Sequence, residues 1–513
     1  MNEHNPNLRF SPGAIRSQPA AGEPRPASVE LGPQALQALS HLDNDFISPR
    51  MLCGLWRLGE AAVIFALGVV LGKPWQADGG VDGLAVVATA AAGAFVASTI
   101  LASAHAYDLP MLRAAGTRLW RVAAGLGLAV GFVAAALALI APKGALEGFP
   151  LVTWYLCALA VVIAGRLVLG QNLRRWARNG RMERRALIVG GGRNAETLIR
   201  GLELAPGNDI RICGIFDDRD DRRSPPLVAG YPKLGTIPEL VEFARRTRID
   251  MLIVTLPLSA EDRLLALLRQ LWVLPLDIRL AAHAGELKFR PRTYSYVGTV
   301  PLIDIVDRPL ADWDGIAKRI LDVVAASAAI LLLSPLMLAA AIAVRLDSPG
   351  PVIFRQKRHG FNNQAVEIFK FRSLYQEASD PEARQIVTKN DKRVTRVGAF
   401  IRKTSIDELP QLFNVLRGDL SLVGPRPHAI HAKSSRNETF TEIVDGYFGR
   451  HKVKPGITGW AQIHGWRGEI DEPEKLVKRF EYDLYYIENW SLLLDLYILA
   501  MTPVSLLRTE AAY

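Results

Sequence analysis

Four apolar runs follow one another in the first third of the chain. They lie near residues 53–72, 83–103, 120–141 and 151–170. Each run is about 20 residues long, the length at which an α-helix crosses roughly 30 Å of hydrocarbon. Buried core helices are the alternative interpretation, but four such runs in succession disfavour it. We therefore predict a four-helix transmembrane bundle over 51–172, preceded over 1–50 by a disordered tail rich in Pro, Asn, Ser and Gly.

Positive charge in the loops sets the orientation of these helices, because positively charged loops stay on the cytoplasmic side. The second loop carries Arg113, Arg118 and Arg121, and six arginines lie between 174 and 185, after the fourth run. Both ends of the four-helix block are therefore expected in the cytoplasm. The arginine cluster is interpreted as a topology signal that touches anionic lipid, and the rest of the chain starts on the cytoplasmic side.

The pattern changes to alternating strands and helices over 173–310. An apolar strand is predicted at 186–189 and a helix at about 195–204. Further strands are predicted at 210–216 and 250–256. Strands that alternate with helices in this way indicate a Rossmann-like α/β domain.

A glycine-rich turn lies between the first strand and the first helix of this domain. Gly190, Gly192 and Ala195 fit the G-x-G-x-x-[G/A] pattern, in which the turn and the helix N-terminus hold a nucleotide phosphate. Asp217 follows the second strand, where an acid that binds the ribose is expected. The alternative is a domain that kept its turn and lost its ligand. Gly190, Gly192 and Asp217 then form either a nucleotide site or the vestige of one.

A fifth apolar run, 320–346, is interrupted by Ser334 and Pro335. Proline removes a helix hydrogen bond and clashes with the preceding turn, so it kinks or breaks a helix. Basic residues at both ends of the run favour a helix that enters the membrane and returns to the same face. We predict a re-entrant helix over about 318–345, and a straight fifth span is the alternative.

The overall composition agrees with apolar helices joined to water-soluble domains. Hydrophobic residues make up 50% and charged residues 22% of the 513 residues, and the mean hydropathy is +0.14. The net charge of +10 fits an anionic membrane surface, phosphorylated substrates or nucleic acid. The three cysteines form no Cys-x-x-Cys pair and are expected as free thiols in a reducing compartment, which excludes a disulfide scaffold.

Residues 350–470 are dense in arginine, lysine, glycine and proline. If 366–372 is extended, Lys370 and Arg372 lie on one face of the strand. Further cations follow at Arg393, Arg396, Arg402, Lys403, Arg426 and Arg467. Guanidinium groups bind phosphate oxygens in a bidentate manner, so such a cluster indicates a site for a di- or polyphosphate. A basic face that lies on anionic lipid is the alternative, and the two are compatible.

Two adjacent acids, Asp407 and Glu408, lie between the arginine-rich segment and an apolar helix at 412–416. One interpretation is structural: Ser405 caps the helix, and Glu408 completes a capping box. The other is catalytic, because one carboxylate can attack phosphorus while a second holds Mg²⁺ beside the substrate phosphates. The spacing alone leaves both interpretations open.

Several short stretches resemble the bacterial sugar transferases, the polyprenyl-phosphate hexose-1-phosphate transferases that are also called monotopic phosphoglycosyl transferases. These stretches are 318–322, 334–335, 350–351 with 355–356, 369–372, 407–411, 423–427, 454–460, and 483–486 with 490–496. Together they cover about 316–508. The four apolar runs and the Rossmann-like domain resemble the large subgroup of this family, so the resemblance extends over nearly the whole chain beyond the N-terminal tail.

The resemblance implies a two-step exchange. Asp407 would attack the β-phosphorus of a UDP-sugar, UDP-glucose or alternatively UDP-galactose, releasing UMP and leaving a sugar-phosphoryl aspartate. Undecaprenyl phosphate would then attack this intermediate. Glu408 would bind Mg²⁺. Contacts with the phosphates or the nucleotide would come from Lys370, Arg402, Arg426 and Arg467.

The implied fold is a membrane protein with a four-helix bundle, a Rossmann-like domain over 173–310 and a mixed α/β catalytic domain over 311–513 that includes the re-entrant helix. The catalytic domain would lie on the cytoplasmic face of the inner membrane and initiate exopolysaccharide, capsule or O-antigen synthesis. A homodimer stays open, and nucleic acid is excluded as a partner.

Two other functions compete with this one. A membrane-anchored nucleotide-sugar dehydratase or epimerase would need a Tyr-x-x-x-Lys pair and a second glycine-rich motif, and the sequence has neither. A non-enzymatic, nucleotide-gated membrane sensor would show no dependence of sugar-phosphate transfer on Asp407.

Overall fold

The computed structural model describes the chain in segments. These are 30–40, 42, 48–77, 83–114, 116, 119–140, 150–178, 181–204, 210–219, 224–257, 260–281, 294–297, 300–310, 312–378, 380, 391–429, 440, 444, 447–466, 468 and 473–508. The chain divides into two compact units, Asn44–Glu183 and a second unit that joins Met1–Asp43 to Arg184–Tyr513.

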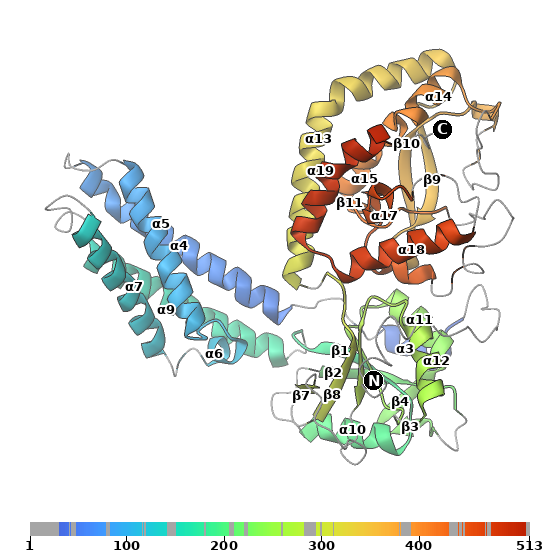
Figure 1. Ribbon diagram of the computed structural model, residues 1–513. Coiled ribbons are helices and arrows are strands. Elements are labelled where there is room, and N and C mark those ends of the chain that lie inside the picture. The colour runs from blue at the N-terminus through green and yellow to red at the C-terminus, as the bar shows by residue number, and fades with distance from the viewer. Residues whose placement is uncertain are drawn as a thin grey trace, which may run out of the picture. The chain divides into compact units, whose positions relative to one another are not determined.

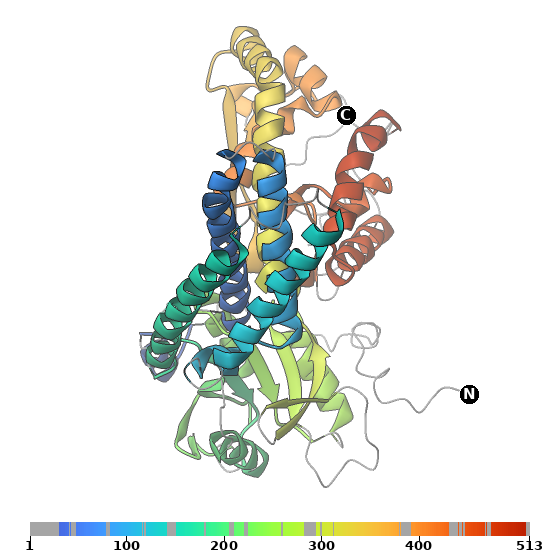
Figure 2. The same ribbon diagram turned by 90° about the vertical axis from the view of Figure 1, so that its left-hand side faces the viewer.

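The unit Asn44–Glu183 is helical. Its helices are α4 (Pro49–Ala77), α5 (Gly83–Ser103), α6 (Leu109–Arg113), α7 (Leu119–Ile140) and α9 (Leu151–Arg178). α4 packs against α5 and α9, and α7 also packs against α5 and α9 (Figures 1 and 2). The four long helices are each apolar and long enough to cross a membrane, and they coincide with the four apolar runs of the sequence.

The interior of this unit is organised around Trp154. The indole is 2% exposed, and its nitrogen donates to the backbone carbonyl of Ile64 at 2.9 Å. A Cβ atom at Gly93 would lie only 2.1 Å from the indole, so glycine at this position makes room for the ring.

A buried ion pair joins α4 to α9. The Nε and Nη2 atoms of Arg166 lie 2.7 and 2.8 Å from the two carboxylate oxygens of Glu60. Arg166 also donates to the carbonyl of Ala106, and the Trp56 indole donates to Glu60. Burying a charge is costly unless it is paired, so this pair favours one register of α4 on α9.

The α/β part of the second unit is built on an eight-stranded sheet with the order β3-β4-β2-β1-β5-β6-β8-β7. The strands are β1 (Arg184–Val189), β2 (Ile210–Phe216), β3 (Leu227–Val228), β4 (Tyr231–Gly235), β5 (Met251–Val254), β6 (Asp277–Ala281), β7 (Tyr294–Val297) and β8 (Val300–Val306). β4, β2, β1, β5 and β6 are parallel, while β3, β8 and β7 pair antiparallel with their neighbours. The strand order reverses direction at β1, as it does at the ligand-binding edge of Rossmann-type sheets.

Helices cover both faces of this sheet. They are α10 (Arg193–Leu204), α11 (Ile237–Arg246) and α12 (Glu261–Leu271). Ile188 and Ile199 belong to the apolar core on the α10 side, and Leu187 and Leu268 belong to the core on the other side. Alternate residues of buried strands face opposite layers. The strands and helices predicted from the sequence in this part are confirmed by the structure.

One part of the N-terminal prediction is wrong. The sequence predicts a disordered tail throughout 1–50, but Pro33–Ser40 form the helix α3. Ala35 is fully buried in the core beside β4 and α11, and the amide of Gly32 donates to Glu239 Oε1 at 3.1 Å. α3 has few polar positions that signal a start or a stop, and it forms because its apolar face packs on a distant surface.

The C-terminal part begins with a long helix and continues as short strands and helices around a compact core (Figure 1). Its elements are α13 (Asp312–Asp347), β9 (Ile353–His359), η1 (Phe361–Asn363), β10 (Ala365–Phe371), η2 (Gln376–Ala378), α14 (Arg396–Lys403), η3 (Ile406–Glu408), α15 (Gln411–Arg417), β11 (Ser421–Val423), η4 (Tyr447–Lys452), β12 (Gly456–Thr458), α17 (Trp460–Ile463), α18 (Pro473–Glu488) and α19 (Leu492–Arg508). β9 pairs antiparallel with β10, and β11 pairs parallel with β12.

α13 contains Ser334 and Pro335, and it is long and apolar enough to cross a membrane. Figure 1 shows that the helix bends rather than running straight. Proline inside a helix is the usual cause of such a bend. Apolar side chains near the break, such as Leu331 and Leu332, are each 79% exposed, as expected for a surface that contacts lipid rather than water.

Both halves of α13 are attached to the C-terminal part. In the first half, Lys318 lies 2.7 Å from Asp495 Oδ2 of α19 and donates to the Val423 carbonyl of β11 at 2.9 Å. In the second half, Met337 and Val344 belong to one apolar cluster with residues of β10 and α14. The two ends of the helix therefore lie on the same domain.

Candidate active site

The hairpin β9–β10 places Lys370, and Asn414 of α15 fixes the hairpin. The amide of Phe369 donates to Asn414 Oδ1 at 2.9 Å, and Asn414 Nδ2 donates to the carbonyl of Glu367 at 2.8 Å. Asn414 thus occupies the edge of β10 as a neighbouring strand would, and it is fully buried. Lys370 is held with its side chain toward η3.

The two acids lie in a single turn of 3₁₀-helix, η3. Ser405, before the turn, has φ of 59°, and its side chain makes no capping hydrogen bond. Asp407 and Glu408 are only 9% and 8% exposed. The capping-box interpretation is therefore wrong, because the carboxylate of Glu408 turns away from the helix start toward the cations of the site.

Glu408 is held by two cations. Lys370 Nζ lies 2.8 Å from Glu408 Oε1. Arg426 grips both oxygens, with Nη2 2.6 Å from Oε1 and Nη1 3.2 Å from Oε2. Lys370 Nζ lies 3.9 Å from Asp407 Oδ2, a longer contact. The structure thus brings together Lys370, Asp407, Glu408 and Arg426, which come from three separate stretches of sequence.

Burial and charge shift the pKa values of these groups. Burial raises the pKa of Asp407, the charge of Glu408 raises it further, and Lys370 opposes both effects. The charge of Glu408 raises the pKa of Arg426, while burial lowers the pKa of Lys370. A carboxylate with a raised pKa is a stronger nucleophile once ionised, and cations nearby can take up the charge of a phosphate.

Arg358 is part of the site, although it is not among the site residues predicted from the sequence. It lies in β9, donates to the Pro427 carbonyl at 2.6 Å and contacts Gln356 Oε1 at 2.9 Å. Burial and the neighbouring Arg426 lower the pKa of Arg358 to about 10. The alternation of side chains along a strand could have revealed Arg358, because it points to the same side as Gln356.

The loop that carries Arg426 is fixed by close backbone packing. A Cβ atom at Gly424 would lie 2.5 Å from the carbonyl oxygen of Lys454, and one at Gly456 would lie 2.1 Å from the amide of Gly424. The amide of Gly424 donates to the carbonyl of Thr458 at 2.9 Å. Gly424 and Gly456 therefore let β11 and β12 meet beside the site.

A buried polar network holds the other side of this loop. Arg450 Nη2 donates to the backbone carbonyl of Arg426 at 2.8 Å and lies 2.5 Å from Asp483 Oδ2. Arg450 also donates to the hydroxyl of Tyr447, which hydrogen-bonds with His428. Burial and Arg450 keep the pKa of His428 well below its usual value, so this histidine is neutral.

The remaining predicted site residues lie elsewhere. Arg402 lies on α14, and its charge opposes the rise that burial causes in the pKa of Asp407. Arg467 lies outside the described residues. Ser334 and Pro335 lie in α13. Arg372, predicted on the same face as Lys370, is 2% exposed and donates to the carbonyls of Pro349 and Ser348 at the end of α13.

The glycine-rich turn belongs to the α/β part. Gly190 and Gly192 have φ of 96° and 85°. The Asp217 carboxylate accepts the amide of Gly191 at 2.6 Å and pairs with Arg219 at 2.7 Å. Burial opposes ionisation, but these hydrogen bonds outweigh it and hold the pKa of Asp217 at about 2. The chain's own carboxylate thus takes the amide that a nucleotide phosphate would use.

In the described part of the chain, five helices are long and apolar enough to cross a membrane, which indicates a membrane protein, and a buried carboxylate pair lies among lysine and arginine side chains. The chain belongs to the bacterial sugar transferase family. The model of that family matches residues 313–509, and a model described as a CoA-binding domain matches residues 102–282.

Three relatives show the extent of the similarity. The UDP-glucose:undecaprenyl-phosphate glucose-1-phosphate transferase of Xanthomonas campestris pv. campestris is 37% identical over 364 residues, 70% of this chain and 74% of that protein. The protein of the same name from Escherichia coli (strain K12) is 38% identical over 341 residues, 66% and 71% of the two chains. The UDP-N-acetylgalactosamine-undecaprenyl-phosphate N-acetylgalactosaminephosphotransferase of Aeromonas hydrophila is 48% identical over 186 residues, 36% and 42% of the two chains.

Proposed function

We propose that this protein transfers glucose-1-phosphate from UDP-glucose to undecaprenyl phosphate and releases UMP. The observation that carries the proposal is the buried pair Asp407–Glu408, gripped by Lys370 and Arg426. The relatives from Xanthomonas and Escherichia are named for this reaction and are similar over both the α/β and the C-terminal parts. The product, a lipid-linked sugar, would begin exopolysaccharide, capsule or O-antigen synthesis.

Asp407 is proposed as the nucleophile. A carboxylate oxygen of Asp407 forms a bond to the β-phosphorus of UDP-glucose, and the bond to the oxygen between the two phosphates breaks, so that UMP leaves. A phosphate oxygen of undecaprenyl phosphate then attacks the same phosphorus, and the bond to Asp407 breaks. Asp407 suits this role because it is less tightly paired than Glu408, with its nearest lysine nitrogen 3.9 Å away.

The cations around the acids are proposed to bind the diphosphate. Lys370 and Arg426 already lie on carboxylate oxygens, and a phosphate oxygen offers the same kind of acceptor. Arg402 and Arg467 are proposed to add further contacts with the phosphates or the nucleotide. Charge that develops on the departing UMP would be stabilised by these groups.

Magnesium is proposed to bind at Glu408. Mg²⁺ takes carboxylate oxygens together with substrate phosphates and waters, and the adjacent acids Asp407 and Glu408 are donors of this kind. Both oxygens of Glu408 contact cations, so Lys370 and Arg426 would move to the diphosphate when the ion binds. When bound, the ion would supply positive charge to the phosphates.

The membrane arrangement is also a proposal. The helices α4, α5, α7 and α9 are proposed to form a transmembrane bundle in the inner membrane. α13 is proposed to be re-entrant, with the C-terminal part on the cytoplasmic face. The bend of α13, a helix that contains Pro335, and the attachment of both its halves to one domain support this proposal, because a straight span would carry its two ends to opposite faces.

The experiment is UMP release by the purified full-length protein with undecaprenyl phosphate, using UDP-glucose, UDP-galactose and UDP-N-acetylgalactosamine in parallel. We expect release with UDP-glucose and its loss in Asp407→Asn. Asp262→Asn, which changes an exposed aspartate of α12, is the matched control. No UMP from any of the three would refute the transferase, and release from another sugar alone would refute glucose.

The topology has its own test. A reporter fused after residue 513 is expected to score cytoplasmic, as is a reporter placed after residue 180. A periplasmic score for the C-terminal fusion alone would refute the re-entrant helix and leave the transferase untouched.

A further inference from the structure

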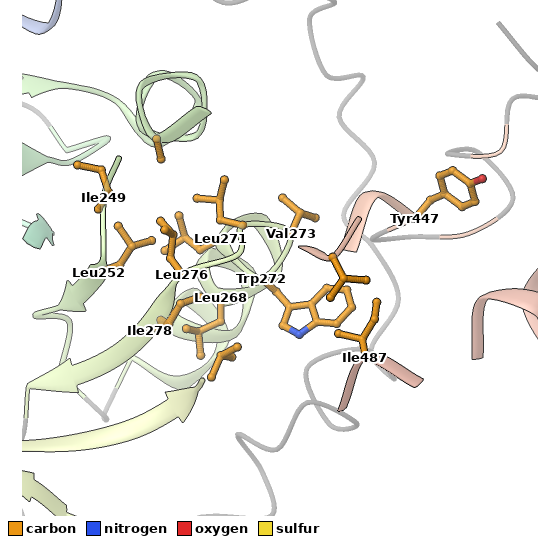
Figure 3. Close-up of a cluster of buried hydrophobic side chains, with 14 of the residues drawn as sticks. Ile249, Leu252, Leu268, Leu271, Trp272, Val273, Leu276, Ile278, Tyr447 and Ile487 are labelled. Atoms are coloured by element: carbon orange, nitrogen blue, oxygen red, sulfur yellow. The ribbon is translucent and has the colours of Figure 1, made fainter. Parts of the chain in front are cut away.

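The α/β part touches the C-terminal part through Trp272, at the end of α12. Figure 3 shows the indole pointing away from the sheet core toward Ile487 of α18. The indole is 5% exposed, and one continuous apolar cluster includes Leu268, Trp272, Tyr447 and Ile487. Trp272 thus lies in a packed junction between the two parts, rather than on a free surface.

The contact is tightest at η4. A Cβ atom at Gly449 would lie only 2.0 Å from the indole ring, so the ring lies directly on the glycine backbone. Lys452 Nζ lies 4.2 Å from the ring centroid, within the range of a cation–π interaction. Gly449 and Lys452 are both buried and both contact the ring, so η4 has little room to shift while Trp272 is in place.

η4 leads directly to the proposed active site. Arg450, between the two residues that Trp272 touches, donates to the backbone carbonyl of Arg426 at 2.8 Å. The side chain of Arg426 in turn grips Glu408. Two contacts therefore separate η4 from the acids of the site, and each is a hydrogen bond with a defined geometry.

The glycine-rich turn of the same α/β part does not fit a nucleotide phosphate. Asp217 takes the amide of Gly191, and the space over Gly191 is closed, since a Cβ atom there would lie 2.2 Å from Ser224 Oγ. A phosphate would have to displace a carboxylate that Arg219 also holds. Among the described residues, the Trp272 junction is a contact through which the α/β part reaches η4 and, beyond it, the acids of the site.

We propose that Trp272 is a positioning residue for the transfer reaction: it clamps η4, and η4 holds Arg426 in place for the diphosphate. The proposal rests on the transferase function proposed above. If the side chain of Arg426 moved from its position, it would stabilise the departing phosphate less well, because such contacts act only at the correct distance. The α/β part then contributes to the reaction by holding η4 in place, rather than by sensing a ligand.

The test compares UMP release by full-length variants at saturating and limiting UDP-glucose. Trp272→Ala is expected to lower kcat at least tenfold, and Trp272→Phe is expected to recover at least half of the loss. Ile199→Ala, which opens a cavity in the α10 side of the same part, is the matched control and is expected to stay within twofold of wild type. Equal losses in both alanine variants would overturn the proposal, because general destabilisation would then explain them.

Gly449→Ala approaches the junction from the opposite side. Its added methyl group would push the indole away, so we expect a loss of the same order as in Trp272→Ala. In the Trp272→Ala background, where the ring is gone, Gly449→Ala is expected to cause no further loss. Additive losses would show that the two residues do not act through one contact.

A double-mutant cycle of Trp272 and Arg426 tests whether Trp272 acts through Arg426. If Trp272 acts through Arg426, Trp272→Ala should change kcat less than twofold in the Arg426→Ala background. A full tenfold loss there would overturn the proposal. Wild-type protein that releases no UMP would refute the transferase function itself, whereas active wild type with an unaffected Trp272→Ala would refute only the positioning role.

Discussion

Replacing Glu408 by glutamine is expected to destabilise the C-terminal part, in addition to removing activity. The carboxylate is 8% exposed and faces Lys370 at 2.8 Å and Arg426 at 2.6 Å. Removing one partner of a buried ion pair leaves the other charge uncompensated and costs about 3–5 kcal/mol. Asp407 stays 3.9 Å from Lys370 and offsets part of this cost. We therefore expect about 3 kcal/mol, near the lower limit of that range.

The assay is thermal unfolding of the full-length protein in detergent, with hydrogen exchange of the β10 and α15 peptides to assign the loss to the C-terminal part. For the C-terminal part, of about 200 residues, 1 kcal/mol corresponds to roughly 2–4 °C, so Glu408→Gln should lower Tm by about 6–12 °C. Glu481→Gln on α18 is the matched control. Its partner Lys478 also lies 2.8 Å away, but both side chains are 52% exposed, so no measurable change is expected.

A double substitution separates the energy of the interaction between Glu408 and Arg426 from the effects of changing each residue alone. Glu408→Gln combined with Arg426→Gln removes both charges, so it should be more stable than Glu408→Gln alone. An unchanged Tm in Glu408→Gln, or strictly additive losses in the double variant, would refute the reasoning that the buried cations depend on Glu408.

Three further outcomes follow from single positions. Because burial raises the pKa of Asp407 and only its ionised form attacks, the rate should fall as pH drops, and at a higher pH than for an exposed aspartate; pH profiles of UMP release test this. Asp217→Asn should cost about 1–2 kcal/mol at pH 7, because the folded pKa of about 2 lies below the usual 3.8 and solvent screens part of the effect; the gap from wild type should close as the pH falls from 4 to 2. Gly424→Ala should cost about 1–3 kcal/mol by crowding a backbone carbonyl, as measured by thermal unfolding, whereas Gly59→Ala, with open space around it, should be tolerated.

The elements that depend on local pattern were predictable from the sequence. The four long helices and the strands β1, β2 and β5 follow from apolar runs and from the strand–turn–helix spacing. α3 was not predictable in this way, because eight residues of modest apolarity form a helix only when another surface covers them. Its cover, beside Glu239 of α11, comes from about 200 residues further along the chain.

The site shows the same division between local and distant causes. The pair Asp407–Glu408 stood out because two acids among many cations are rare by themselves. The cations that surround the pair were harder to predict from the sequence. Lys370 and Arg372 are predicted on one face of a strand, but they have different roles. Arg372 instead donates to the carbonyls of Ser348 and Pro349, directly after the end of α13. The sequence alone carries no information about that neighbour.

The attachment of α13 explains how one protein could bring a lipid-linked acceptor, undecaprenyl phosphate, together with a water-soluble donor, the nucleotide-sugar. Asp322 of α13 accepts the amide of Leu422 at 3.0 Å, in the strand that directly precedes the Gly424 loop and Arg426. If α13 enters and leaves the same face as proposed, the headgroup region of the membrane lies at this strand. An acceptor phosphate carried by lipid would then reach the level of Arg426 without leaving the membrane surface, and only the nucleotide-sugar would have to diffuse through water.

Asp322→Ala should therefore impair the step with undecaprenyl phosphate more than the first release of UMP, which a single-turnover assay without acceptor measures separately. Equal losses in both steps would argue for a purely structural role of this anchor.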